Sequence, residues 1–193
     1  MTIELLKKED LMRSTRFASL AVCLLVYLAA VQAAEYPLAL AASAQVTKGA
    51  TTVTTTFTIH IDRVMNETFR TRVTDALKFG GYPKFLPALR ALPAIGTIEF
   101  EGRKVELKYV REEPHEKGSR LVLVADQPLF FLGDPSKARA GYELTMVELI
   151  LDAKSTGAGT MTGAARVKPT PDGGIVVDEF EVAPVQLSVR RQQ

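Results

Sequence analysis

The sequence predicts an α+β fold, a mainly antiparallel β sandwich or barrel-like sheet with two short helices inserted after the second strand. Three observations predict it. Residues 51–62 alternate between apolar and polar side chains, residues 66–92 change to helical spacing, and later strands recur about every 10 residues with turn signals between them.

The clearest strand is residues 51–62, TTVTTTFTIHID. Its polar face carries threonines together with His60 and Asp62, and period-two alternation predicts a half-buried strand. Residues 38–46 are expected to pair with it as a hairpin through Thr47-Lys48-Gly49. The apolar face of the strand consists of Val53, Phe57, Ile59 and Ile61.

A helical insertion is expected at about residues 66–92. Asn66 is placed to cap the first helix, because its side chain can accept a hydrogen bond from a free amide at the helix start. Gly80-Gly81 is expected to end this helix, and Tyr82-Pro83 to begin a second one that stops at Pro93.

The rest of the chain reads as strands separated by turns. Turns are expected at Glu101-Gly102, at residues 155–157 and at residues 169–174, PTPDGG. Residues 142–153 become apolar on both faces, which predicts a central strand. The remaining strands are expected at residues 95–100, 104–109, 120–125, 158–168, 175–182 and 185–189.

Residues 1–33 have the pattern of a signal peptide. Arg13 and Arg16 precede a mainly apolar run over residues 17–30, and small residues follow. Cleavage is expected after Ala33, with Ala34 as the alternative position. An uncleaved membrane anchor is the competing interpretation, although the run is borderline for the about 20 residues that a span requires. Residues 34–193 are then a single antiparallel-β domain.

Composition excludes several function classes. The 24 basic and 22 acidic residues are interleaved and give a net charge of +2, so no basic patch predicts nucleic-acid binding. The one cysteine, Cys23, lies in the predicted leader, which rules out a disulfide framework or a Cys-rich zinc module in the mature chain. Contact with a membrane is expected only through the leader during export.

Catalytic patterns are few. No serine lies in a Gly-x-Ser-x-Gly motif, and no sequence feature predicts a cofactor. His60 and Asp62 are two residues apart on one strand face, so they could act together as metal ligands or in a hydrolase. The competing interpretation is that both continue the solvated, threonine-rich face of the strand.

An apolar group near the polar loop at residues 133–141 is the ligand-binding candidate. Its residues are Phe130, Phe131, Tyr142 and Met146. Antiparallel barrels often bind ligands at one end, whereas the alternative is that these side chains are core. The predicted function is an exported protein that binds a small apolar or amphipathic molecule or an envelope protein partner. The alternative is a hydrolase or metal-dependent enzyme that uses His60 and Asp62.

The chain resembles an uncharacterised family of small exported bacterial proteins. The residues that carry the resemblance are I-H-I-D-R, T-D-A-L-K, G-G-Y-P-K-F-L and A-L-R between Thr58 and Arg90, and later F-L-G, A-G-Y-E-L and A-R-V-K-P. The resemblance implies export, a single domain and a Gram-negative source, hence a periplasmic or extracellular location. It implies no catalytic residue.

Overall fold

A computed structural model describes residues 34–48, 51–131 and 138–192. All of them belong to one compact unit that spans residues 32–193. The predicted signal peptide, residues 1–33, lies outside the described residues.

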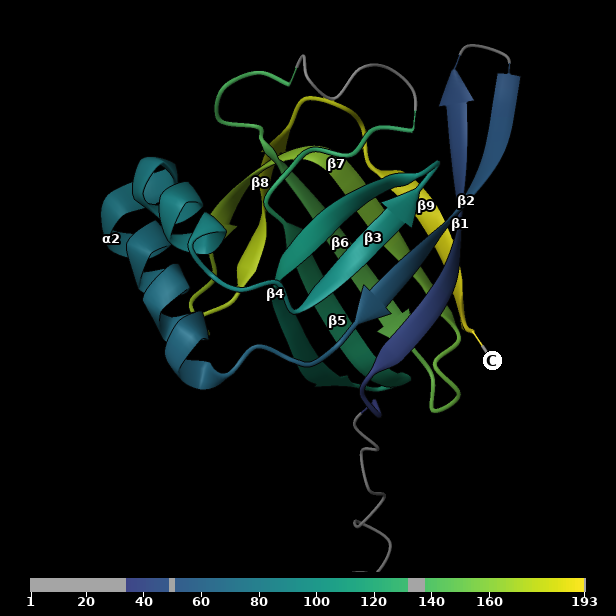
Figure 1. Ribbon diagram of the computed structural model, residues 1–193, viewed down its shortest axis with the longest axis horizontal. Coiled ribbons are helices and arrows are strands. Elements are labelled where there is room, and N and C mark those ends of the chain that lie inside the picture. Colours follow the sequence, from purple (N-terminus) through teal and green to yellow (C-terminus); the bar gives the residue numbers. More distant parts are fainter. Residues whose placement is uncertain (1–33, 49–50, 132–137, 193) are drawn as a thin grey trace, which may run out of the picture. The chain divides into compact units, whose positions relative to one another are not determined.

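The described residues form nine strands and one helical element (Figure 1). The strands are β1 (Leu38–Lys48), β2 (Thr51–Ile61), β3 (Gly96–Phe100), β4 (Arg103–His115), β5 (Gly118–Ala125), β6 (Leu144–Leu151), β7 (Gly157–Pro169), β8 (Ile175–Phe180) and β9 (Val185–Arg191).

The sheet closes into a barrel. Every pairing is antiparallel, and eight strands form a ring in the order β6-β5-β4-β3-β2-β1-β9-β7, which β7 closes by pairing with β6. Strand β8 is not part of the ring. It pairs with β7 over residues 165–169 of β7, whereas β9 pairs with β7 over residues 157–161. The barrel-like sheet predicted from the alternation is confirmed.

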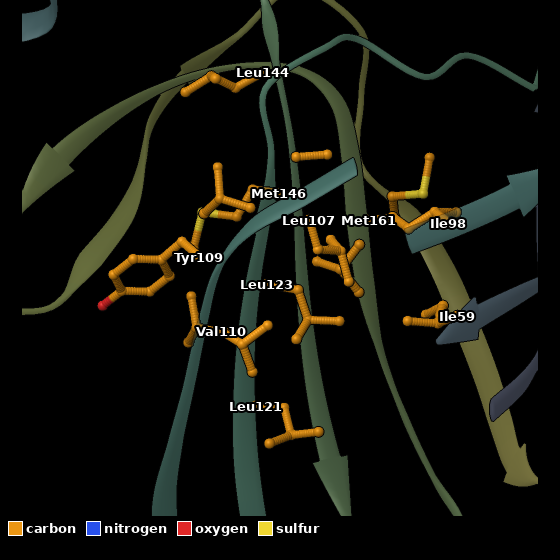
Figure 2. Packing of buried hydrophobic residues seen from close by; sticks show 14 of the residues in the cluster. Ile59, Ile98, Leu107, Tyr109, Val110, Leu121, Leu123, Leu144, Met146 and Met161 are labelled. Atoms are coloured by element: carbon orange, nitrogen blue, oxygen red, sulfur yellow. The ribbon is translucent and has the colours of Figure 1, made fainter. Parts of the chain in front are cut away.

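Apolar side chains fill the inside of the barrel. The register places Leu40, Ile59, Ile98 and Val105 in one row across four strands. Inward side chains of β1 to β5 such as Ile59 and Leu123 are fully buried, and Figure 2 shows them packed together with Leu107. Closing the sheet also removes most free strand edges.

The helical insertion is one element, α2 (Glu67–Arg90), and the prediction of two short helices is wrong. Asn66 caps it as expected, since its Oδ1 accepts from the Phe69 amide at 2.9 Å. Gly81 leaves helical geometry at φ 63° and ψ −171°, but helical geometry resumes directly after it. The two glycines therefore kink the helix instead of ending it.

Buried side chains of α2 come from both sides of this kink, and the element lies on one side of the barrel (Figure 1). They are Val73, Thr74, Leu77, Phe85, Leu86 and Leu89. Among the residues that the structure describes, no helix is both long enough and apolar enough to cross a membrane.

Most predicted turns and strands are confirmed. Glu101 and Gly102 form the tight turn between β3 and β4 with φ of 48° and 74°, as a two-residue hairpin requires. Residues 170–174 separate β7 from β8. Strand β6 pairs with β5 on one side and β7 on the other, so it is central as its two apolar faces predicted.

Candidate functional site

The four apolar ligand-binding candidates do not meet in one place. Phe130 and Tyr142 form a small cluster with Ala164. The Phe131 ring lies instead between two others, with its centroid 5.1 Å from that of Phe57 and 5.0 Å from that of Phe100. Met146 is 2% exposed and belongs to the main core.

Tyr142 is also held by polar contacts. Its hydroxyl donates to Glu179, and the Arg139 guanidinium lies 4.4 Å from its ring centroid. Both the ring and the hydroxyl are therefore engaged within the chain, as expected of a residue that fixes the end of β6.

His60 and Asp62 lie on the outward face of the barrel, where the alternation placed them. His60 pairs with Ala39 of β1 and Thr97 of β3, and Asp62 follows directly after β2. In the described residues, no group of three or more His, Cys, Asp or Glu side chains could hold a metal ion.

A pocket of about 960 Å³ lies next to this polar face. It is formed by strands β1, β2, β3, β4, β7 and β9 and by the turns that join them. Its lining residues are Ala41, Ala42, Ser43, Thr56, Phe57, Thr58, Glu99, Phe100, Glu101, Gly102, Arg103, Lys104, Thr156, Gly157, Ser188, Val189, Arg190 and Gln192.

Strand register brings five of these residues into one line, here called the outward row. Lys104 pairs with Glu99, Glu99 with Thr58, Thr58 with Ala41, and Ala41 with Arg190. Residues from β4 to β9 that are far apart in the sequence thus share one face of the sheet, because directly paired residues point to the same side.

A second line of hydroxyl groups runs beside the outward row. Ser43 pairs with Thr56 on one side and Ser188 on the other. Phe57, Phe100 and Val189 are also among the lining residues, but their side chains are almost completely buried on the inward face of the sheet. The accessible lining therefore offers Ala41 and threonine methyl groups, neutral hydrogen-bonding groups and charges together, as ligand pockets commonly do.

The charged side chains of the pocket differ in whether they have a partner. Lys104 Nζ lies 2.8 Å from Glu99 Oε1, and this hydrogen bond and charge lower the pKa of Glu99 and raise the pKa of Lys104. Arg103 donates to the Phe130 carbonyl at 3.1 Å. Within the described part of the chain, Arg190 has no ion-pair or hydrogen-bond partner through its side chain.

A second groove of about 720 Å³ lies between β8 and the strands β5 to β7. Met146 is the only apolar candidate from the sequence among its lining residues, and Phe180, which is half exposed, forms part of its wall. Arg120 and Glu148 pair with each other at its edge.

Sequence reasoning missed the residues of the pocket, although one signal was present. The threonines of residues 51–58 were recognised as a polar face, but only the pairing of β2 with β1 and β3 shows what lies beside them. Arg190 and Glu99 are separated by about half the chain, and no local spacing relates them.

The chain was compared with protein-family models, with curated proteins and with solved structures, and none of the three comparisons found a match. The resemblance to a family of exported bacterial proteins stays a prediction.

Proposed function

We propose that this chain is an exported protein that binds a small amphipathic molecule in the pocket beside the outward row. The mixed lining of the pocket carries the proposal. Ala41 and the methyl groups of Thr56 and Thr58 suit the apolar part of such a molecule, and the hydroxyls suit its polar part. A volume of about 960 Å³ is of the size that small-molecule sites have.

Arg190 favours an anionic head group. Its guanidinium is the one cation of the lining without a partner in the described residues, since Lys104 pairs with Glu99 and Arg103 bonds a carbonyl. A carboxylate, sulfonate or phosphate can accept two parallel hydrogen bonds from a guanidinium. The proposed ligand therefore has an apolar body and an acidic group that reaches β9.

Export supports the same proposal from the sequence. The pattern of residues 1–33 indicates a cleaved leader, and a chain without cysteine after that leader can fold in any redox environment. The proposed location is the periplasm or the outside of the cell.

The test uses 8-anilinonaphthalene-1-sulfonate, an apolar anion whose fluorescence rises on binding. Thr56→Phe fills the pocket from its wall, and its affinity for the probe should fall at least about tenfold, or 1.4 kcal/mol. Thr54→Phe is the matched control: it makes the same change on the same face of β2, but residue 54 does not line the pocket. Equal affinities for the two variants would refute binding at this pocket.

A second pair of variants tests the head group. Arg190→Glu should lower the affinity for the probe about tenfold and reduce the dependence of that affinity on salt. Lys117→Glu makes the same charge change on an exposed residue of the turn between β4 and β5 and should leave the affinity unchanged. If both variants weaken binding equally, only the overall charge of the protein matters.

A further inference from the structure

Glu112 lies on the face of β4 that points into the barrel. It pairs with Leu121 of β5, two residues beyond the pair of Val110 with Leu123, and both Val110 and Leu121 are fully buried. A carboxylate among such neighbours loses part of its hydration, so it needs compensating partners.

Both carboxylate oxygens of Glu112 are bonded by the first described residues of the chain. The Ala34 backbone nitrogen donates to Oε1 at 2.8 Å, and the Tyr36 hydroxyl donates to Oε2 at 3.0 Å. Burial raises the pKa of Tyr36, and the charge of Glu112 and this hydrogen bond raise it further, so the phenol stays protonated and remains a donor. Ala34 and Tyr36 also pack against the core.

These two donors are neutral, and the described residues give Glu112 no cationic partner. Glu106 and Glu113 of the same strand both have one: Glu106 lies 2.6 Å from Lys108, and Glu113 lies 2.7 Å from Arg111 and 2.8 Å from Arg120. In the described part of the chain, no Lys, Arg or His side chain forms an ion pair with Glu112.

We propose that Glu112 is the receptor for the new amino terminus that leader cleavage creates at Ala34. Hydrolysis of the bond between Ala33 and Ala34 by a signal peptidase consumes one water, leaves a carboxylate on the leader and leaves an α-amine on Ala34. This amine is protonated at neutral pH. The nitrogen that donates to Glu112 as an amide then becomes the missing cation, and a neutral hydrogen bond becomes an ion pair.

The proposal rests on the proposed export, and it assigns Glu112 a positioning role. Processing then does more than release the chain, since it locks residues 34–36 to β4 and thereby fastens the start of β1 to the barrel. Because the carboxylate stabilises the charged form of the amine, the pKa of that amine should lie above its ordinary value of about 8.

The full chain is expressed with its leader, and the processed form is purified from the cell envelope. Its intact mass should correspond to residues 34–193. The α-amine is then reacted at pH 7.5 with 2-pyridinecarboxaldehyde, which modifies neutral amino termini. The reaction of the folded protein should be about eightfold slower than in 8 M urea, as a pKa rise of one unit from about 8 gives at pH 7.5.

Glu112→Gln keeps the size and the hydrogen-bonding capacity of the side chain and removes its charge. It should restore the fast reaction, whereas Glu35→Gln, which neutralises an exposed carboxylate beside the same amine, should not. Glu112→Asp keeps the charge and shortens its reach, so it should give an intermediate rate and serves if the glutamine variant does not fold.

The possible outcomes separate the export proposal from the proposed role of Glu112. A chain that keeps its leader overturns cleavage, and with it the role of Glu112, whereas a chain found only in the cytosol overturns the export proposal. A chain that is cut before another residue, or one cut before Ala34 whose amine reacts as fast in the folded protein as in urea, overturns the role of Glu112 and leaves export standing. Binding of the fluorescent probe should not change in Glu112→Gln, because Glu112 does not line the pocket.

Discussion

The two faces of the barrel wall differ most clearly where strands β1, β2, β3 and β9 lie side by side. Ile59 faces inward and is completely buried, whereas the adjacent Thr58 faces outward and forms part of the outward row. The inward positions are aliphatic or aromatic, and the outward positions carry hydroxyls and charges. Adjacent residues of one strand therefore have different roles: the inward residue contributes to stability, and the outward residue belongs to the candidate site.

This separation has an energetic basis. Burying an aliphatic side chain completely stabilises a fold by about 1.5–3 kcal/mol, whereas exposed polar groups exchange one set of hydrogen bonds for another with water. Substitutions on the outward row should therefore change binding without changing folding. The variants described next test this separation, beginning with the largest expected effect.

Ile59→Ala should be the most damaging change, because it leaves a cavity in a closed barrel. We expect a loss of about 2–5 kcal/mol in the free energy of unfolding, measured by urea denaturation. The neighbour Thr58→Ala removes a side chain of similar size from the outward face and should change that free energy by less than about 0.5 kcal/mol. Similar losses in both variants would show that the two faces do not separate stability from binding.

Gly159→Ala tests how closely β7 approaches β6. A Cβ at this position would overlap the backbone of Glu148, so the two strands would have to move apart. We expect a loss of about 1–3 kcal/mol, as for other overpacked sites. Ala158→Ser adds one atom at the next residue, which is exposed, and should cost almost nothing in the same denaturation experiment. A tolerated alanine at residue 159 would contradict the close approach.

Asp126 is an exception to the separation, since it is a buried carboxylate outside the outward row. One of its oxygens is buried without a hydrogen-bond partner, and burial raises its pKa although Lys108 opposes the rise. A raised pKa in the folded state means that stability is greatest below the unfolded value of about 3.9 and is lost as the pH rises through the folded value.

Asp126→Asn removes the titrating carboxyl group and therefore the loss of stability as the pH rises. The variant should melt about 2 °C higher than the unaltered protein at pH 7, a change of less than about 1 kcal/mol, and at the same temperature at pH 3. Thermal melts at the two pH values measure the difference. Asp75→Asn on the exposed side of α2 is the control and should show no difference at either pH. A lower melting temperature for Asp126→Asn at pH 7 would mean that the charge of Asp126 stabilises the fold.

The fold was predictable to the extent that it depends on local patterns. Period-two alternation located β2, and turn residues located the β3–β4 and β7–β8 hairpins, because each signal acts over a few residues. The helical region was recognised too, but Gly81 was expected to end a helix. A glycine ends a helix only if the chain then turns away, and here packing of both halves of α2 keeps them as one element.

The candidate site was much less predictable. Phe130, Phe131, Tyr142 and Met146 are close in sequence, yet their side chains belong to different clusters, and no local pattern predicts this separation. The outward row depends on which strands become neighbours, and Ala41 of β1 pairs with Arg190 of β9, far away in the sequence. Pairing between distant strands is a property of the closed barrel, and single-strand patterns carry no information about it.

Glu99 and Lys104 provide the smallest and most local test, because their ion pair lies at the solvent-facing surface. Their hydrogen bond, and then their charges, lower the pKa of Glu99. Lys104→Met should return that pKa toward its ordinary value, and a carboxyl NMR titration would measure the change. A lowered pKa stabilises the fold above the unfolded value, and this contribution is lost as the pH falls through the folded value. Because exposed pairs contribute little, the melting temperature should stay the same while the titration shifts.

Binding of the sulfonate probe should weaken in Lys104→Met, since Glu99 is then left without its cation beside an anionic ligand. A variant that lowers the melting temperature instead would show that the outward row also supports the barrel, and the separation of the two faces would fail at this pair.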